Sequence, residues 1–234
     1  MTAHRTLVLW DVDLTLVDFT GTGRDWYGVA LAKAHGIELR HMPSFPGRTE
    51  LAITRELLRV HGHDTGDDHV AKVFAELIAA ANADVTLAER GRALPGVETL
   101  LAELANRDDV VQSLVTGNLV ELAECKLSPF GLDKHIDFGI GGYGSLSEHR
   151  HDLVADAIAR AERKHGGPFP VDRVVVVGDT PRDVAGALHH GAVAIAVATG
   201  RSSARELADS GAHAVLPDLA DLDLALDALL ATRA

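Results

Sequence analysis

The N-terminal part of the chain carries an apolar run that leads directly into two acidic residues. Residues 7–10 are all apolar, and Asp11 and Asp13 follow them with one residue between. Such an unbroken run is typical of a strand buried on both faces of a parallel sheet, and ligands of these sheets bind at the carboxyl ends of the strands. Side chains two residues apart share one side of an extended segment, where two like charges repel unless a cation or a shared proton intervenes. We therefore expect a divalent metal ion at this strand end.

The second half of the chain alternates predicted strands with predicted helices. This alternation is typical of an α/β fold with a doubly wound parallel sheet. We expect strands at residues 110–115, 136–140, 174–177 and 194–198, with a weaker one at 214–216, and helices at 97–105, 120–128, 153–163, 182–189 and 204–208.

The segment between the first and second strands of the sheet has a different character. Its signals are almost wholly helical, at residues 26–35, 51–61 and 68–82. Gly21, Gly23 and the turn at 94–96 would be its hinges, because glycine and proline mark element boundaries. We therefore expect two domains, a core of residues 1–17 and 94–234 and an inserted helical domain of residues 18–93.

Composition limits the classes of partner. The 234 residues are 47% hydrophobic and 24% charged, which is ordinary for a globular protein with a sizeable core. The net charge of −12 argues against a surface for nucleic acid or anionic membrane. No secretory signal is visible and no apolar run approaches the roughly 20 residues of a membrane span, so we expect a cytoplasmic protein. A monomer and a homodimer both remain open, because the apolar helix faces of the insert could pack on the core or on a second subunit.

A second apolar run also ends in acidic residues. Four valines at residues 174–177 lead to Asp179, and Asp183 follows four residues later. Asp183 fits the acidic position of a helix-capping box, which leaves Asp179 without a role. Together with Asp11 and Asp13 they make four carboxylates, a set of hard oxygen ligands suited to Mg²⁺.

A third strand end carries a possible anion site. The hydroxyl of Thr116 and the amide of Gly117 near a helix start could bind a phosphate group, whereas Gly117 and Asn118 equally fit a tight turn and a helix cap. Both interpretations stay open at this point. A phosphate group also needs a cation from the protein, for which Arg150 and Lys126 are the candidates.

These motifs, in this order, resemble those of the haloacid dehalogenase-like hydrolase superfamily. Residues 11–15 match its first motif, DxDxT, and Thr116 its second, while residues 178–183 match its fourth, GDTPxD. The third motif is usually a lysine before a proline, and Arg150 stands in that place here. The insert resembles the helical cap of the phosphoglycolate-phosphatase-like branch, with residues 45–49 as its substrate-facing loop.

The resemblance implies a Rossmann-like core with a cap domain and a Mg²⁺-dependent phosphatase that acts on a small phosphorylated metabolite through an aspartyl-phosphate. In this scheme Asp11 is the nucleophile and Asp13 the general acid and base. The resemblance further implies that Asp11, the Asp13 carbonyl, Asp179 and Asp183 bind the metal. The phosphate would be bound by Thr116, Gly117 and either Arg150 or Lys126. Arg48 of the cap would contact an anionic end of the substrate.

Three alternatives belong to other reaction or protein classes. A dehalogenase attacks carbon without a metal, and that branch lacks the second aspartate that is present here as Asp13. A phosphomutase or phosphonate hydrolase would use a lysine or histidine from the cap, and residues 19–23 contain neither. A non-catalytic phosphate-binding module would not need Asp11, Asp13, Thr116 and Asp179 together.

Overall fold

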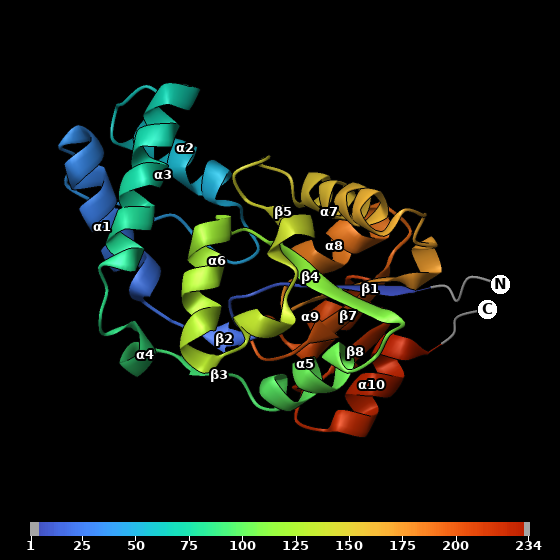
Figure 1. The fold of residues 1–234 in the computed structure, drawn as a ribbon. Helices are drawn as coiled ribbons and strands as arrows, with labels where there is room; N and C mark the ends of the chain where they lie inside the picture. Colours follow the sequence, from blue (N-terminus) through green and yellow to red (C-terminus); the bar gives the residue numbers. More distant parts are fainter. Residues whose placement is uncertain (1–4, 232–234) are drawn as a thin grey trace.

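The computed structural model describes residues 5–231, which are built around a parallel sheet of six strands (Figure 1). The strand order is β5-β4-β1-β6-β7-β8. This arrangement confirms the predicted α/β class. The strands are β1 (Thr6–Trp10), β4 (Val110–Thr116), β5 (Gly142–Tyr143), β6 (Val174–Gly178), β7 (Val193–Val197) and β8 (Ala214–Leu216).

The central strands are buried on both sides, as their apolar runs predict. Every residue of β1, β6 and β7 is buried. The register pairs Trp10 of β1 with Leu114 of β4 and with Val177 of β6. The three strands therefore end at the same edge of the sheet, which brings Asp11, Thr116 and Asp179 to that edge.

Helices cover both faces of the sheet. In Figure 1, α7 (Arg150–His165) and α8 (Pro181–His189) lie on one face, and α5 (Val97–Ala105) and α10 (Leu222–Leu230) lie on the other. The short helix α9 (Ala204–Asp209) contacts β7 and β8. Side chains alternate between two apolar clusters, so that Leu7 and Leu9 face one layer while Val8 and Trp10 face the other.

The predicted helical insert is a group of helices beyond the carboxyl edge of the sheet (Figure 1). It contains α1 (Thr22–His35), α2 (Glu50–Val60), α3 (Asp67–Asn82) and the short α4 (Leu87–Arg90). The chain enters it through β2 (Val17–Asp18) and leaves through β3 (Arg92–Ala93), which pair antiparallel. Helix α6 (Val120–Leu127) lies between α3 and the core and belongs to the same apolar cluster as both. No helix among residues 5–231 is both long and apolar enough to cross a bilayer.

The strand predicted at residues 136–140 is wrong. This stretch forms short 3₁₀ turns, at Asp133–His135 and Phe138–Ile140, and the edge strand comes later as the two residues of β5. The side chain of Asp137 accepts a hydrogen bond from the N–H of Gly139 at 3.2 Å and so stabilises the turn. A side chain on Gly142 would overlap the carbonyl of Leu153, so the edge strand depends on glycine where α7 packs closely. Two further 3₁₀ turns are Ser128–Phe130 and Val171–Arg173.

Candidate active site

The chain turns sharply after β1, and this turn presents Asp11 and Asp13 at the edge of the sheet. The N–H of Asp11 donates to the carbonyl of Val177 at 2.8 Å, which keeps Asp11 in line with the strand. Leu14 has a φ of 59°, a left-handed conformation that residues other than glycine rarely adopt. Its N–H donates to the carbonyl of Val17 at 2.7 Å and closes the turn. A strained residue beside two carboxylates is typical of a functional site.

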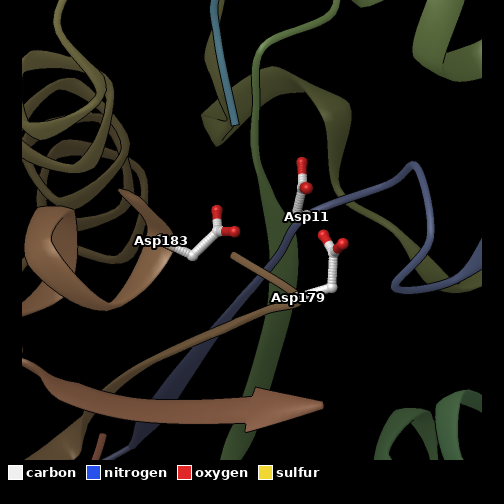
Figure 2. Close-up of side chains that lie close together, drawn as sticks. All are labelled: Asp11, Asp179 and Asp183. Atoms are coloured by element: carbon white, nitrogen blue, oxygen red, sulfur yellow. The ribbon is translucent and has the colours of Figure 1, made fainter. Parts of the chain in front are cut away.

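Asp11, Asp179 and Asp183 form an acidic cluster. Figure 2 shows the three side chains close together. One carboxylate oxygen from each lies within 4.8 Å of the others, and all three residues are buried. Burial raises the pKa of Asp11, and burial together with the neighbouring charges of Asp183 and Asp11 raises the pKa of Asp179. Like charges crowded away from water in this way favour the presence of a cation.

Asp183 has two separate roles in this structure. Its Oδ2 accepts hydrogen bonds from the backbone N–H of Thr180 at 3.0 Å and from the Thr180 hydroxyl at 2.6 Å, which completes the predicted capping box of α8. Its Oδ1 is buried and has no aligned hydrogen-bond donor among the described residues. That oxygen forms an ion pair with Arg150, and Asp183 also belongs to the acidic cluster, so the capping and the metal interpretations of Asp183 are compatible.

Arg150 is the cation next to the acidic cluster. It begins α7, and its Nη2 lies 2.6 Å from Asp11 Oδ1 while its Nε lies 2.5 Å from Asp183 Oδ1. Nη2 also donates to the carbonyl of Val115 at 3.0 Å. One guanidinium faces three carboxylates, so negative charge remains for a divalent cation. The buried, oxygen-only donor set of Asp11, Asp179 and Asp183 fits Mg²⁺.

The Asp13 side chain is not part of this cluster, although the set of four carboxylates included it, and the resemblance implied only its backbone carbonyl for the metal. Both of its carboxylate oxygens contact the Lys126 ammonium group, at 2.8 and 2.7 Å, and Oδ2 also accepts from Asn118 Nδ2 at 2.8 Å. We predicted Lys126 as a phosphate ligand, but in this structure its partners are Asp13 and Asn118. Of the predicted metal set, the side chains of three aspartates come together, and the Asp13 side chain stands apart beside Lys126.

Asn118 is a site residue that the sequence interpretation missed. One of the two open interpretations made it a helix cap, but α6 begins later, at Val120, and no side chain caps it. Asn118 instead lies between Thr116, whose hydroxyl accepts from Asn118 Nδ2 at 2.9 Å, and Asp13. Its position two residues after a strand-end threonine was the available signal.

The insert closes over these residues and forms a cavity of about 400 Å³. The core side of the cavity contains Asp11, Asp13, Thr116, Lys126, Arg150 and Asp179, and the insert side contains Phe19, Arg24, Phe45, Arg48 and Ile53. All of the predicted catalytic and phosphate-binding residues therefore line this one cavity, together with the predicted cap residue Arg48.

The arginines of the cavity differ in how their charges are compensated. Arg48 has its own counter-ion, because its Nη1 lies 2.6 Å from Glu56 Oε2. Arg24 on α1 and Arg201 after β7 also line the cavity and form no ion pair with any of residues 5–231. These two were not predicted, because their approach to the site depends on how distant segments pack.

Comparison with known families finds a match for about a third of the chain, in its C-terminal half. A family model described as HAD-hydrolase-like matches residues 148–222, the segment that contains Arg150, Asp179 and Asp183. This segment of the chain is similar to the haloacid dehalogenase-like hydrolases. Among curated proteins, no sequence match was found.

Solved structures share the fold of this protein over nearly its whole length. A hydrolase from Pseudomonas syringae has a TM-score of 0.64 at 22% identity, with 95% of this chain and 98% of that one covered. A predicted phosphatase from Clostridium acetobutylicum has a TM-score of 0.67 at 22% identity over 93% and 96%. A predicted phosphoglycolate phosphatase from Haemophilus somnus has a TM-score of 0.65 at 17% identity over 96% and 99%. At these identities the similarity establishes the fold.

Proposed function

We propose that this protein is a haloacid dehalogenase-like hydrolase, a Mg²⁺-dependent phosphatase acting on a small phosphorylated metabolite. The observation that carries the proposal is the different surroundings of Asp11 and Asp13. Asp11 lies in the buried acidic cluster beside Arg150, whereas the Asp13 side chain is 43% exposed, faces the cavity and pairs with Lys126. Two carboxylates in such different environments suit two different roles in one reaction.

In the first step, a carboxylate oxygen of Asp11 would attack phosphorus while the bond from phosphorus to the leaving oxygen breaks. Asp13 would give its proton to that oxygen, so the product alcohol leaves neutral. The phosphoryl group would then be bonded to Asp11, and Asp13 would be a carboxylate.

In the second step, Asp13 would take a proton from a water molecule whose oxygen attacks the phosphorus of the aspartyl-phosphate. The bond between Asp11 and phosphorus would break and inorganic phosphate would leave. Asp11 is thereby restored as a carboxylate and Asp13 as an acid, so the protein returns to its starting state.

The acidic cluster would bind the metal ion of this reaction, and the second motif would bind the phosphoryl group. Asp11, Asp179 and Asp183, with the backbone carbonyl of Asp13, would hold Mg²⁺. When bound, the ion supplies positive charge that offsets repulsion between the nucleophile and the phosphoryl oxygens. The Thr116 hydroxyl and the Gly117 amide, with Arg150 beside Asp11, would contact the phosphoryl oxygens.

Residues 18–93 would act as a cap domain that excludes bulk water from the reaction. Three contacts support this closed arrangement. The N–H of Glu50 donates to the Gly117 carbonyl at 2.8 Å, the N–H of Leu51 donates to the Gly144 carbonyl at 2.9 Å, and Arg182 Nη1 donates to the Pro46 carbonyl at 2.7 Å.

The cavity also suggests that the substrate carries a second anionic group, as in a phosphorylated carboxylic acid. Arg24 and Arg201 provide uncompensated positive charge in a protein whose net charge is −12. Arg48, our predicted contact for that group, lines the same cavity but is paired with Glu56. Phosphoglycolate is therefore a reasonable first test compound.

The test measures initial rates of phosphate release from a panel of phosphorylated metabolites, with Mg²⁺ and with chelator. We expect Mg²⁺-dependent release that falls by about 1,000-fold or more in Asp11→Asn, because the nucleophile is lost. Asp209→Asn is the matched control, since its side chain is 71% exposed on α9. Phosphate release without Mg²⁺, or unchanged release by Asp11→Asn, would refute the proposal, and transfer of phosphate to a second hydroxyl in place of release would indicate a mutase.

A further inference from the structure

Each of the two first-motif aspartates has its own cation. Arg150 contacts Asp11 and Asp183, whereas Lys126 contacts both oxygens of Asp13 and the Asn118 Oδ1 at 2.7 Å. Lys126 is 7% exposed and lies in the last turn of α6. Arg150 therefore accompanies the proposed nucleophile, and Lys126 accompanies the proposed general acid and base.

The orientation of the Asp13 side chain is fixed by polar contacts rather than by packing, because the side chain is 43% exposed to the cavity. Asp13 Oδ2 accepts hydrogen bonds from Lys126 Nζ at 2.7 Å and from Asn118 Nδ2 at 2.8 Å. Asp13 Oδ1 accepts a further one from Lys126 Nζ at 2.8 Å. Asn118 is itself held by the Thr116 hydroxyl at 2.9 Å. The carboxylate is thus fixed at both oxygens by groups of the core.

The insert covers this ion pair from the other side. Trp26 of α1 is 4% exposed, and the Lys126 ammonium group lies 5.9 Å from the centre of its ring. A cation over an aromatic face, shielded from water, is held more strongly than an exposed one. The position of the lysine is therefore defined by both the core and the insert.

We propose that Lys126, together with Asn118, is a positioning residue that holds the Asp13 carboxylate where it can reach the leaving oxygen. This inference rests on the proposed phosphatase function. A positioned proton donor matters most when the leaving group is a poor one, because an alkoxide cannot leave without a proton. Lys126 also balances the negative charge that appears on Asp13 once its proton has moved to the leaving oxygen.

The test compares two leaving groups in wild type and in Lys126→Met. For an alkyl phosphate we expect kcat/KM to fall by about 100-fold, within the range that general acid catalysis contributes. For p-nitrophenyl phosphate, whose leaving group needs no proton, we expect a change of less than about threefold. Lys134→Met is the matched control, because Lys134 is exposed and outside the cavity, and it should change neither rate.

A double-mutant cycle tests whether Lys126 acts through Asp13. We expect Asp13→Asn with Lys126→Met to be no slower on the alkyl phosphate than Asp13→Asn alone, since residues that act as a unit are not additive. Lys126→Arg, which keeps the charge, should recover part of the alkyl phosphate activity, and thermal unfolding confirms that each variant is folded.

Two results would overturn the inference. One is an equal loss on both substrates in Lys126→Met, and the other is a multiplicative loss in the double variant. Failure of the proposed function can be told apart from failure of this inference, because wild type would then release no phosphate or Asp11→Asn would remain active.

Discussion

The backbone carbonyl of Arg48 occupies the space in which a side chain on Gly117 would lie. The insert and the second motif therefore touch backbone to backbone, and the neighbouring hydrogen bond from the Glu50 N–H to the Gly117 carbonyl, at 2.8 Å, depends on this approach. Any larger residue at position 117 must push the two segments apart.

Gly117→Ala should therefore reduce activity more than stability. We expect kcat/KM to fall by about tenfold to 100-fold, because displacing a reacting group by about 1 Å has effects of this size. Gly167→Ala is the control, since a side chain there would meet no atom within 4 Å. Equal kinetics for the two variants would contradict the role of this contact.

Arg150→Met should destabilise the protein in a way that Mg²⁺ partly reverses. Removing one partner of a buried ion pair costs about 3–5 kcal/mol, because the carboxylates of Asp11 and Asp183 lose their compensating charge. A bound divalent cation replaces part of that charge and binds only the folded state. Thermal unfolding with Mg²⁺ and with chelator checks this, and a larger Mg²⁺ shift in the variant than in wild type is the expected result.

Arg160→Met is the comparison for that experiment. Its ion pair with Asp156 is a half-exposed helix pair, so its loss should cost less than about 1 kcal/mol and add no response to Mg²⁺. A Mg²⁺ response of the same size in Arg150→Met, Arg160→Met and wild type would argue against a metal in the acidic cluster.

Glu50 should make stability depend on pH. It is buried beside Tyr27, which donates a hydrogen bond to it, and burial raises the pKa of Glu50 to about 7, against 4.5 for a free glutamate. The folded state thus binds the proton more tightly than the unfolded state, so stability falls as the pH rises from about 4.5 to about 7.

Glu50→Gln removes this dependence because the amide stays neutral. We expect its free energy of unfolding to exceed that of wild type by about 1–3 kcal/mol at pH 8, with the difference vanishing near pH 4.5. Denaturant unfolding at several pH values measures it, with the exposed Glu124→Gln as a control that should follow wild type.

The role of Arg24 and Arg201, which line the cavity without an ion pair among residues 5–231, can be tested with two substrates that have the same two-carbon chain. Phosphoglycolate and ethyl phosphate differ in whether the end opposite the phosphate bears a carboxylate. In the double variant Arg24→Gln with Arg201→Gln, we expect KM to rise about tenfold for phosphoglycolate and to stay within about twofold for ethyl phosphate, because charge-assisted contacts are lost only for the former. Arg205→Gln, 89% exposed on α9, is the control, and equal KM changes for both substrates would refute the assignment.

Much of the fold could be predicted because local patterns and the final packing agree. The valine run before Asp179 can be buried only as a central strand, and the capping residues around Asp183 specify the helix that follows. The alignment of Asp11, Thr116 and Asp179 then follows from the geometry of parallel strands.

The missed features depend on tertiary contacts. Asn118 resembles a helix cap in sequence, yet it forms hydrogen bonds to Asp13, which is distant along the chain. The edge strand β5 begins at a glycine, required by the close approach of α7 rather than by strand propensity. The predicted helix began at residue 153, beyond Arg150, whereas the structure starts α7 at Arg150 and so directs its side chain into the acidic cluster.

The pairing of β2 with β3 has a consequence for how such a protein can diversify. Val17 is paired with Ala93, and Asp18 with Arg92, so the chain leaves the core and returns to it at one place. The entropy of closing a loop grows only slowly with its length, and here the two ends are already joined. A segment of quite different length could be spliced in at this junction by recombination while the sheet kept its register, so the part that meets the substrate can change faster than the part that carries out the chemistry.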